Sequence, residues 1–272
     1  MKPHLIVLDL DGTLLTDEKK ITEKTEKTLK LAQEKGHHIM IATGRPFRTS
    51  EPFYRQLELK TPIVNFNGAF VHHPDDHSWQ SVHKPLALPV VQDVIETIQP
   101  FQHQNIIAEV LDDVFINTHD EKLLSIYGSG NRVLTTGDLR KKLRVDPTSL
   151  LICVERGTTE IIRNHLSETH AEIIDHRRWG APYADVIEVI HIGLSKAVGV
   201  SQVANHLNIP KERIIAFGDE ENDLEMLELA GVGVAMGNSI DTVKVIADEI
   251  TGTNNDDGIV PILKERLHLN EL

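Results

Sequence analysis

Two carboxylates follow a short, unbroken apolar run near the start of the chain. Residues 5–8 are all apolar, and the segment after them reads Asp9-Leu10-Asp11-Gly12-Thr13. An unbroken run of this length is typical of a strand that is buried on both faces, as in a parallel sheet. Because such sheets bind ligands at the carboxyl ends of their strands, Asp9 and Asp11 favour an α/β fold with a functional site at that edge.

The residues after this loop predict an alternation of helices and strands. A charged stretch at residues 22–35 that stops at Gly36 is typical of an exposed helix with a glycine cap. Strands are predicted at residues 38–42 and 62–66, and Thr43-Gly44-Arg45-Pro46 separates the first of them from another helix. Strand–helix–strand connections are right-handed and give parallel sheets, so we expect these strands to lie beside the first one.

The last part of the chain repeats this alternation, whereas the middle differs. The last part predicts helices at residues 195–207, 222–229 and 240–247 and strands at residues 214–217 and 232–235. The middle predicts a hairpin at residues 110–114 and helices near residues 90–98 and 160–170. We therefore expect an α/β fold in which residues 1–84 and 188–272 form a Rossmann-like, doubly wound, mostly parallel core, and residues 85–187 form an inserted α+β cap domain.

Composition limits the classes of function. The 272 residues include 28 Lys and Arg against 41 Asp and Glu, a formal net charge of −13. This charge repels nucleic acid and anionic lipid at long range, and no apolar stretch approaches the roughly 18 residues of a membrane span. The single cysteine, Cys153, lies inside an apolar run, and no signal peptide is recognisable. We expect a cytoplasmic protein with no nucleic-acid or membrane partner, and the oligomeric state stays open.

Four acidic residues follow two of the predicted strands. Asp9 and Asp11 come after the first strand, and Asp219 and Asp223 come after the strand at residues 214–217. Carboxylates at the rim of a buried sheet have to be paired, protonated or bound to a cation. Ligation by oxygen alone favours Mg²⁺, which takes phosphate oxygens as further ligands. Ca²⁺ is the lesser option, because the spacing of the acids is not that of an EF-hand.

A phosphoryl group beside a metal in an acidic protein also needs hydrogen-bond donors. Thr43 ends the second predicted strand beside the backbone amides of Gly44 and Arg45, and Lys196 lies in the first turn of a predicted helix. Each signal is weak alone, since threonine caps helices and most helical lysines are solvated. Their order along the chain, between the two acidic segments, strengthens the prediction of a phosphoryl site.

Together these segments resemble the four motifs of the haloacid dehalogenase superfamily of phosphatases. The matching segments are Asp9-Leu10-Asp11-Gly12-Thr13, Thr43-Gly44-Arg45, Lys196 and Gly218-Asp219-Glu220-Glu221-Asn222-Asp223. The most similar subgroup is the Cof-like hydrolases, which insert an α/β cap between the second and third motifs. Asn67-Gly68-Ala69, Gly233-Val234-Ala235-Met236-Gly237-Asn238 and Asn255-Asp256-Asp257-Gly258-Ile259 are also similar. The resemblance covers nearly the whole chain, but it covers the cap only by position.

The resemblance implies a covalent mechanism with two acids. Asp9 would be the nucleophile that forms an aspartyl phosphate, and Asp11 would protonate the leaving alcohol and then activate the attacking water. Mg²⁺ would be held by the side chain of Asp9, the backbone carbonyl of Asp11 and the side chain of Asp219. The metal would neutralise charge on the transferring phosphoryl group.

The resemblance also implies which residues hold the phosphoryl group. The expected binding residues are Thr43, Gly44, Lys196 and Asn222. Asp223 would orient Lys196 or a metal-bound water, and Arg45 is a candidate contact for the rest of the substrate. Ala197 departs from the pattern, because many relatives have glycine after the lysine.

The function expected from these residues is a Mg²⁺-dependent phosphatase of small phosphorylated metabolites, such as sugar phosphates or phosphorylated cofactors. One alternative is a phosphotransferase or phosphomutase of the same superfamily. Another is a module that senses metal and phosphate without catalysis, although such a module would be expected to lack Asp9, Asp11 or Lys196. The sequence does not name the substrate.

Four other polar segments are interpreted as ordinary loops or turns. They are His72-His73-Pro74-Asp75-Asp76-His77, Asp112-Asp113, Gly128-Ser129-Gly130-Asn131 and Arg177-Arg178-Trp179. The histidine segment has metal-ligating residue types without a tetrahedral ligand pattern. The second and fourth segments lie in the expected cap, where contact with a substrate is the less favoured interpretation.

Overall fold

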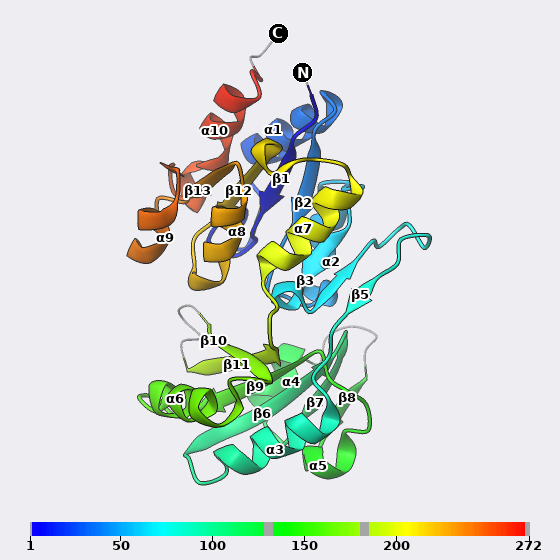
Figure 1. The fold of residues 1–272 in the computed structure, drawn as a ribbon, viewed down its shortest axis with the longest axis vertical. Helices are drawn as coiled ribbons and strands as arrows, with labels where there is room; N and C mark the ends of the chain where they lie inside the picture. The colour runs from blue at the N-terminus through cyan, green and yellow to red at the C-terminus, as the bar shows by residue number, and fades with distance from the viewer. Residues whose placement is uncertain (1, 128–132, 180–184, 270–272) are drawn as a thin grey trace. The chain divides into compact units, whose positions relative to one another are not determined.

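A computed structural model describes residues 2–127, 133–179 and 185–269 of the chain (Figure 1). The chain divides into two compact units, of which the first combines Met1–Val82 with Ser195–Leu272 and the second is His83–Leu194. The sequence places the insertion at residues 85–187. In the structure, the strand at Val186–His191 belongs wholly to the second unit, where it pairs with two other strands.

The first unit is built on a parallel sheet of five strands. The strands are β1 (Leu5–Leu8), β2 (His38–Ile41), β12 (Ile214–Gly218), β13 (Val232–Ala235) and β14 (Glu249–Ile250). They lie in the order β14-β13-β12-β1-β2, so β1 pairs with β2 on one side and with β12, from the other end of the chain, on the other side (Figure 1). The predicted parallel core is confirmed, but the expectation that the strand at residues 62–66 belongs to this sheet is wrong, because that strand lies in a separate sheet.

Helices cover both faces of this sheet. They are α1 (Glu23–Glu34), α2 (Phe47–Gln56), α7 (Lys196–His206), α8 (Leu224–Leu229), α9 (Asp241–Ile246) and α10 (Ile259–Arg266). Leu8 packs in one hydrophobic cluster with side chains of α1, α2 and α10, whereas Val7 packs in another with side chains of α7, α8 and α9. Because neighbouring residues of β1 enter opposite layers, the sheet is doubly wound, as predicted.

A smaller antiparallel sheet adjoins the core. Its strands are β3 (Ile63–Asn65), β4 (Phe70–His72) and β5 (Val82–His83), in that order. The turn between β3 and β4 is the short 3₁₀ segment η1 (Phe66–Gly68). Three further 3₁₀ segments are η2 (Lys211–Arg213), η3 (Glu221–Asp223) and η4 (Asn254–Asp256).

The second unit is an α+β layer built on a six-stranded sheet. Its strands are β6 (His103–Val110), β7 (Asp113–Ile116), β8 (Leu134–Thr136), β9 (Ser149–Val154), β10 (Ile174–Arg178) and β11 (Val186–His191), in the order β10-β11-β9-β6-β7-β8. Its helices are α3 (Leu88–Ile98), α4 (Glu121–Tyr127), α5 (Leu139–Lys142) and α6 (Thr159–His170). The predicted hairpin is confirmed as β6 and β7, which pair from Val110 and Asp113.

Cys153 lies on β9, where burial raises the pKa of its thiol to about 11. The thiol is therefore protonated at neutral pH, which keeps its reactivity low. Within the described part of the chain, no helix combines the length and the apolar character that crossing a membrane requires.

Candidate active site

The site lies where β1, β2 and β12 end. Asp9 follows β1 directly, Thr43 follows β2 after one residue, and Asp219 follows β12 directly. These strands are neighbours and parallel, so their carboxyl ends meet at one edge of the sheet. The structure brings together at this edge the first, second and fourth of the segments singled out in the sequence, and the start of α7 adds Lys196.

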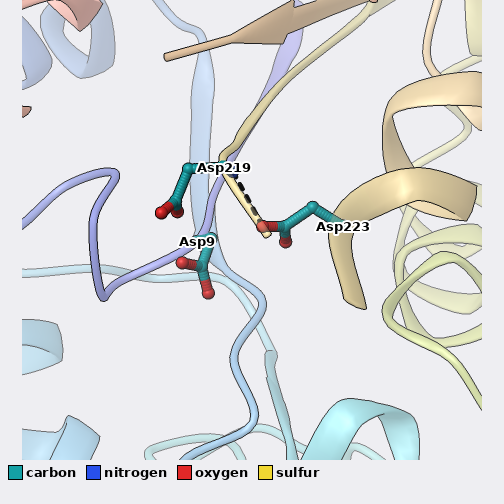
Figure 2. A group of neighbouring side chains, drawn as sticks. All are labelled: Asp9, Asp219 and Asp223. Atoms are coloured by element: carbon teal, nitrogen blue, oxygen red, sulfur yellow. Dashed lines mark hydrogen bonds between the residues drawn. The ribbon is translucent and has the colours of Figure 1, made fainter. Parts of the chain in front are cut away.

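Three carboxylates form a buried cluster (Figure 2). One oxygen from each of Asp9, Asp219 and Asp223 lies within 4.8 Å of the other two. Asp9 is 5% exposed, Asp219 is 7% exposed and Asp223 is fully buried. Like charges at this spacing in a low dielectric repel one another strongly, so the cluster needs a positive partner.

Lys196 supplies part of that positive charge. Its ammonium donates to Asp9 Oδ1 at 2.6 Å and to Asp223 Oδ1 at 2.7 Å, and the side chain is 1% exposed. Burial alone would lower the pKa of Lys196, but the carboxylates of Asp223 and Asp9 raise it above its ordinary value. Lys196 is therefore a permanently charged, fixed donor at neutral pH.

One ammonium does not neutralise three carboxylates. Burial raises the pKa of Asp9 to about 7, against the attraction of Lys196 and with the repulsion of Asp223. Burial, followed by repulsion from Asp9 and Asp223, raises the pKa of Asp219 to about 9. A bound cation would relieve this repulsion, and the atoms available as metal ligands are all carboxylate oxygens. The residues therefore fit a metal ion.

Asp223 uses both of its oxygens within the protein. Oδ1 accepts from Lys196. Oδ2 accepts from the backbone amide of Asp219 at 2.9 Å (Figure 2) and from that of Glu220 at 3.1 Å. Asp223 thus orients Lys196 and shapes the loop after β12, and the metal-binding atoms of the cluster are left to Asp9 and Asp219.

The loop after β1 is closely fitted to Asp219. Thr13 Oγ1 donates to Asp219 Oδ1 at 2.8 Å. Gly12 has a left-handed φ of 77°, and a Cβ at this position would overlap the Asp219 carboxylate. Asn238 Nδ2 donates to the Gly12 carbonyl at 2.8 Å. Thr13 and Asn238 lie in segments that the sequence had singled out, but neither had been assigned a role.

Asp11 is turned toward two cations and is absent from the carboxylate cluster. Arg45 donates to it with two nitrogens, Nε to Oδ2 and Nη2 to Oδ1, both at 2.6 Å. Lys19 Nζ donates to Oδ1 at 2.7 Å. Burial would raise the pKa of Asp11, but the hydrogen bonds and charge of Arg45, and then those of Lys19, lower it to about 2. Arg45, the candidate substrate contact, is thus paired with Asp11 here.

Asn67 links the loop after β2 to Asn222. The Thr43 carbonyl accepts from the backbone amide of Asn67 at 3.1 Å, and Thr43 Oγ1 accepts from the amide of Arg45 at 3.1 Å. The Asn222 amide donates to Asn67 Oδ1 at 3.0 Å. Asn67 belongs to the segment Asn67-Gly68-Ala69, which resembles the family, but the sequence predicts no role for it. Its one visible signal was an Asn-Gly pair after a strand, which is typical of a turn.

No histidine of the described residues joins the carboxylate cluster. His73 Nδ1 accepts from the backbone amides of Asp75 and Asp76, so the histidine-rich segment is held together by its own bonds as a polar loop. In the second unit, Asp112 lies in the turn of the β6–β7 hairpin, as expected. The interpretation of Arg177 and Arg178 as loop residues is wrong, because both lie on strand β10, where Arg177 pairs with Glu188 of β11. The segment at residues 128–131 lies outside the described residues.

Comparisons with known proteins identify the family. Residues 6–263 match the model of the haloacid dehalogenase-like hydrolases. The 5-amino-6-(5-phospho-D-ribitylamino)uracil phosphatase YitU of Bacillus subtilis strain 168 is 52% identical over 268 residues, which are 98% of this chain and 99% of that protein. The pyridoxal phosphate phosphatase YbhA of Escherichia coli K12 is 28% identical over 98% of this chain and 100% of its own.

Comparison with solved structures gives the same family. The crystal structure of a haloacid dehalogenase-like hydrolase from Bacteroides thetaiotaomicron has a TM-score of 0.82 and 30% sequence identity, and the match covers 98% of this chain and 100% of that one. The expected α/β fold with a Rossmann-like core is confirmed. The chain therefore belongs to the haloacid dehalogenase-like hydrolases and is a phosphomonoesterase of their Cof-like subgroup.

Proposed function

We propose that this phosphatase forms its aspartyl phosphate on Asp9, with Mg²⁺ as the metal. The observation that carries the proposal is the position of the Asp9 carboxylate, which is buried in the cluster and accepts a hydrogen bond from the ammonium of Lys196. Lys196 engages Oδ1, and Oδ2 has no hydrogen-bond partner among the described residues. Oδ2 is thus the oxygen available to attack phosphorus.

The donor set supports Mg²⁺. The side chains of Asp9 and Asp219 and the backbone carbonyl of Asp11 would hold it, since oxygen ligands suit this hard cation. When bound, it supplies positive charge to the phosphoryl oxygens in the transition state. Asp223 supports the arrangement by holding Lys196 and the loop after β12.

The phosphoryl group has four proposed protein contacts. Lys196 supplies a charged donor, while Thr43, Gly44 and Asn222 lie around the same strand ends. Donors that are fixed before the substrate arrives stabilise developing charge without reorganisation. This placement supports transfer of a phosphoryl group to Asp9 in preference to mere binding of phosphate.

We propose Asp11 as the acid and base. In the first step Asp9 Oδ2 bonds to phosphorus, the bond from phosphorus to the ester oxygen breaks, and the departing oxygen takes a proton from Asp11. In the second step Asp11 takes a proton from water, which attacks phosphorus and releases inorganic phosphate and free Asp9. Because Arg45 and Lys19 keep Asp11 ionised, its side chain has to leave these cations before it can carry the proton.

We further propose that the second unit, His83–Leu194, is a cap that selects the substrate. The first candidate substrate is 5-amino-6-(5-phospho-D-ribitylamino)uracil, because the relative named for this activity is 52% identical over nearly its whole length. Pyridoxal phosphate, for which a 28% identical relative is named, is the second. The cytoplasmic location expected from the sequence stays a prediction.

The test is release of inorganic phosphate from both esters by the purified protein. Mg²⁺ should support turnover, EDTA should abolish it, and Asp9→Asn should abolish it without loss of the fold as seen by circular dichroism. Adding excess sugar acceptor separates hydrolysis from phosphotransfer, since transfer would yield a new ester in place of inorganic phosphate. Turnover by Asp9→Asn at the wild-type rate would contradict the assignment of the nucleophile.

A further inference from the structure

Three consecutive residues of η1 have left-handed backbone conformations. The φ angles are 49° at Phe66, 51° at Asn67 and 100° at Gly68. Positive φ is uncommon outside glycine and is unfavourable for a bulky residue such as phenylalanine. Such conformations persist only where surrounding contacts hold them, and they gather at functional sites.

The contacts that hold this turn come from two parts of the active site. On one side, the backbone amide of Phe66 donates to the Arg45 carbonyl at 3.3 Å and that of Asn67 donates to the Thr43 carbonyl at 3.1 Å. On the other side, the turn passes so close to the start of α7 that a Cβ on Gly68 would overlap the Ser195 carbonyl. The turn therefore lies between the loop after β2 and the residue that precedes Lys196.

The side chain of Asn67 connects this turn to the proposed phosphoryl contacts. It is 3% exposed, and its Oδ1 accepts from Asn222 Nδ2 at 3.0 Å. Its carboxamide also packs against Gly44, where an added Cβ would lie 3.1 Å from Nδ2 and 3.3 Å from Oδ1. One buried carboxamide thus contacts two of the four residues proposed to bind the phosphoryl group.

We infer that Asn67 is a positioning residue for the phosphoryl site. Its carboxamide sets the spacing between the Thr43-Gly44 loop and Asn222, and its left-handed backbone brings the turn against the start of α7. Groups that bind a reacting phosphoryl group lose much of their contribution to the rate when they are displaced by as little as about 1 Å. A residue that fixes their positions therefore affects catalysis without touching the substrate. The inference rests on the function proposed above.

Asn67→Gly removes the carboxamide but keeps the backbone conformation, because glycine adopts the left-handed conformation without strain. The variant therefore tests the side chain alone. In the presence of Mg²⁺, we expect this variant to weaken competitive inhibition by inorganic phosphate by about tenfold and to raise KM more than it lowers kcat, as loss of a buried hydrogen-bond partner would. The thermal midpoint should fall by a few degrees, because the variant also loses this buried hydrogen bond in the absence of phosphate.

The chain offers a matched control. Asn208 also has a left-handed φ, 55°, but it is exposed and outside the site. Asn208→Gly makes the same chemical change at the same backbone conformation and should leave phosphate inhibition and kcat/KM at wild-type values. Weakened inhibition in both variants would indicate a general effect of asparagine removal and would overturn the inference.

A double-mutant cycle with Asn222→Ala tests how Asn67 acts. If Asn67 acts through Asn222, Asn222→Ala should weaken phosphate inhibition in the wild type but add nothing in Asn67→Gly. In Asn67→Asp, which keeps an acceptor for Asn222 and tolerates the left-handed backbone, Asn222→Ala should again have an effect. Equal effects of Asn222→Ala in the wild type and in Asn67→Gly would overturn the inference, and Asn67→Ser, whose shorter side chain lacks the carboxamide, takes the place of Asn67→Gly in this comparison if glycine prevents folding.

Failure of the proposed function gives a different result. If Lys196→Met and Asp9→Asn retain phosphatase activity, the proposed roles of the whole site are wrong. If those two variants are inactive, and Asn67→Gly has the wild-type turnover and the wild-type inhibition by inorganic phosphate, only the positioning role of Asn67 is wrong.

Discussion

Removing the charge of Lys196 should destabilise the protein far more than an ordinary loss of a surface ion pair. Lys196→Met keeps the length and apolar stem of the side chain and removes the ammonium that lies 2.6 Å from Asp9 and 2.7 Å from Asp223. Both carboxylates are at most 7% exposed at their side chains, so water does not replace the lost partner.

The size of the effect follows from this burial. Removing one partner of a buried ion pair costs about 3 to 5 kcal/mol of unfolding free energy, because the other charge is left uncompensated. The pair between Lys19 and Asp11 has nearly the same length, 2.7 Å, but the two side chains are 55% and 42% exposed. Lys19→Met should therefore cost about 1 kcal/mol or less.

Urea unfolding in EDTA at pH 8 measures both variants. This pH is above the pKa of about 7 of Asp9, so its carboxyl group is mostly ionised in the wild type. In Lys196→Met the folded-state pKa of Asp9 should rise further, so the destabilisation should shrink as the pH falls and the group takes a proton. Equal losses for the two variants at pH 8 would refute the reasoning.

Three further predictions concern the same site. Asp11→Asn should slow release of the first equivalent of alcohol from alkyl phosphates by about 10² to 10⁴ but should spare the first equivalent of p-nitrophenol from p-nitrophenyl phosphate, whose leaving group needs no proton; equal slowing of both first turnovers would contradict the acid role. In EDTA the thermal midpoint should fall as the pH rises from about 4 to about 9, because the folded state holds protons on Asp9 and Asp219 that the unfolded chain releases near pH 3.8. Mg²⁺ should remove this pH dependence. A midpoint that rises over this range in EDTA would refute the prediction. Gly12→Ala should abolish turnover, because the added Cβ would overlap the Asp219 carboxylate. The control is Gly36→Ala, at a glycine with a φ of 85° and open space around it, which should keep full turnover. An active Gly12→Ala enzyme would show that the loop after β1 can move aside.

The core could be predicted because its local patterns agree with its long-range packing. β1 has no polar residue because Ile6 and Leu8 enter one helical layer while Leu5 and Val7 enter the other. The short motifs at the strand ends then identified the family and the activity, and the comparisons confirm both. The roles of the individual site residues stay predictions.

Features that depend on distant contacts could not be predicted. The small β3-β4-β5 sheet was missed in part because its strands have only two or three residues, too few for a periodic pattern. The helix predicted at residues 222–229 begins as a 3₁₀ turn, and α8 starts at Leu224, because Asp223 bends back to the amides of Asp219 and Glu220. The pairing of Arg45 with Asp11 joins residues 34 positions apart, and no local signal announces it.

The place of β1 in the middle of its sheet sets the order in which the enzyme can be completed during synthesis. β2 emerges from the ribosome soon after β1 and covers one of its edges, but the other edge waits for β12. Thr13 and Asp219, which have to meet at the site, are separated by 206 positions. A nascent chain that ends before β12 therefore exposes an unpaired edge of the wholly apolar strand β1. Such an edge favours aggregation, so we expect the chain to depend most on chaperones before β12 has been synthesised.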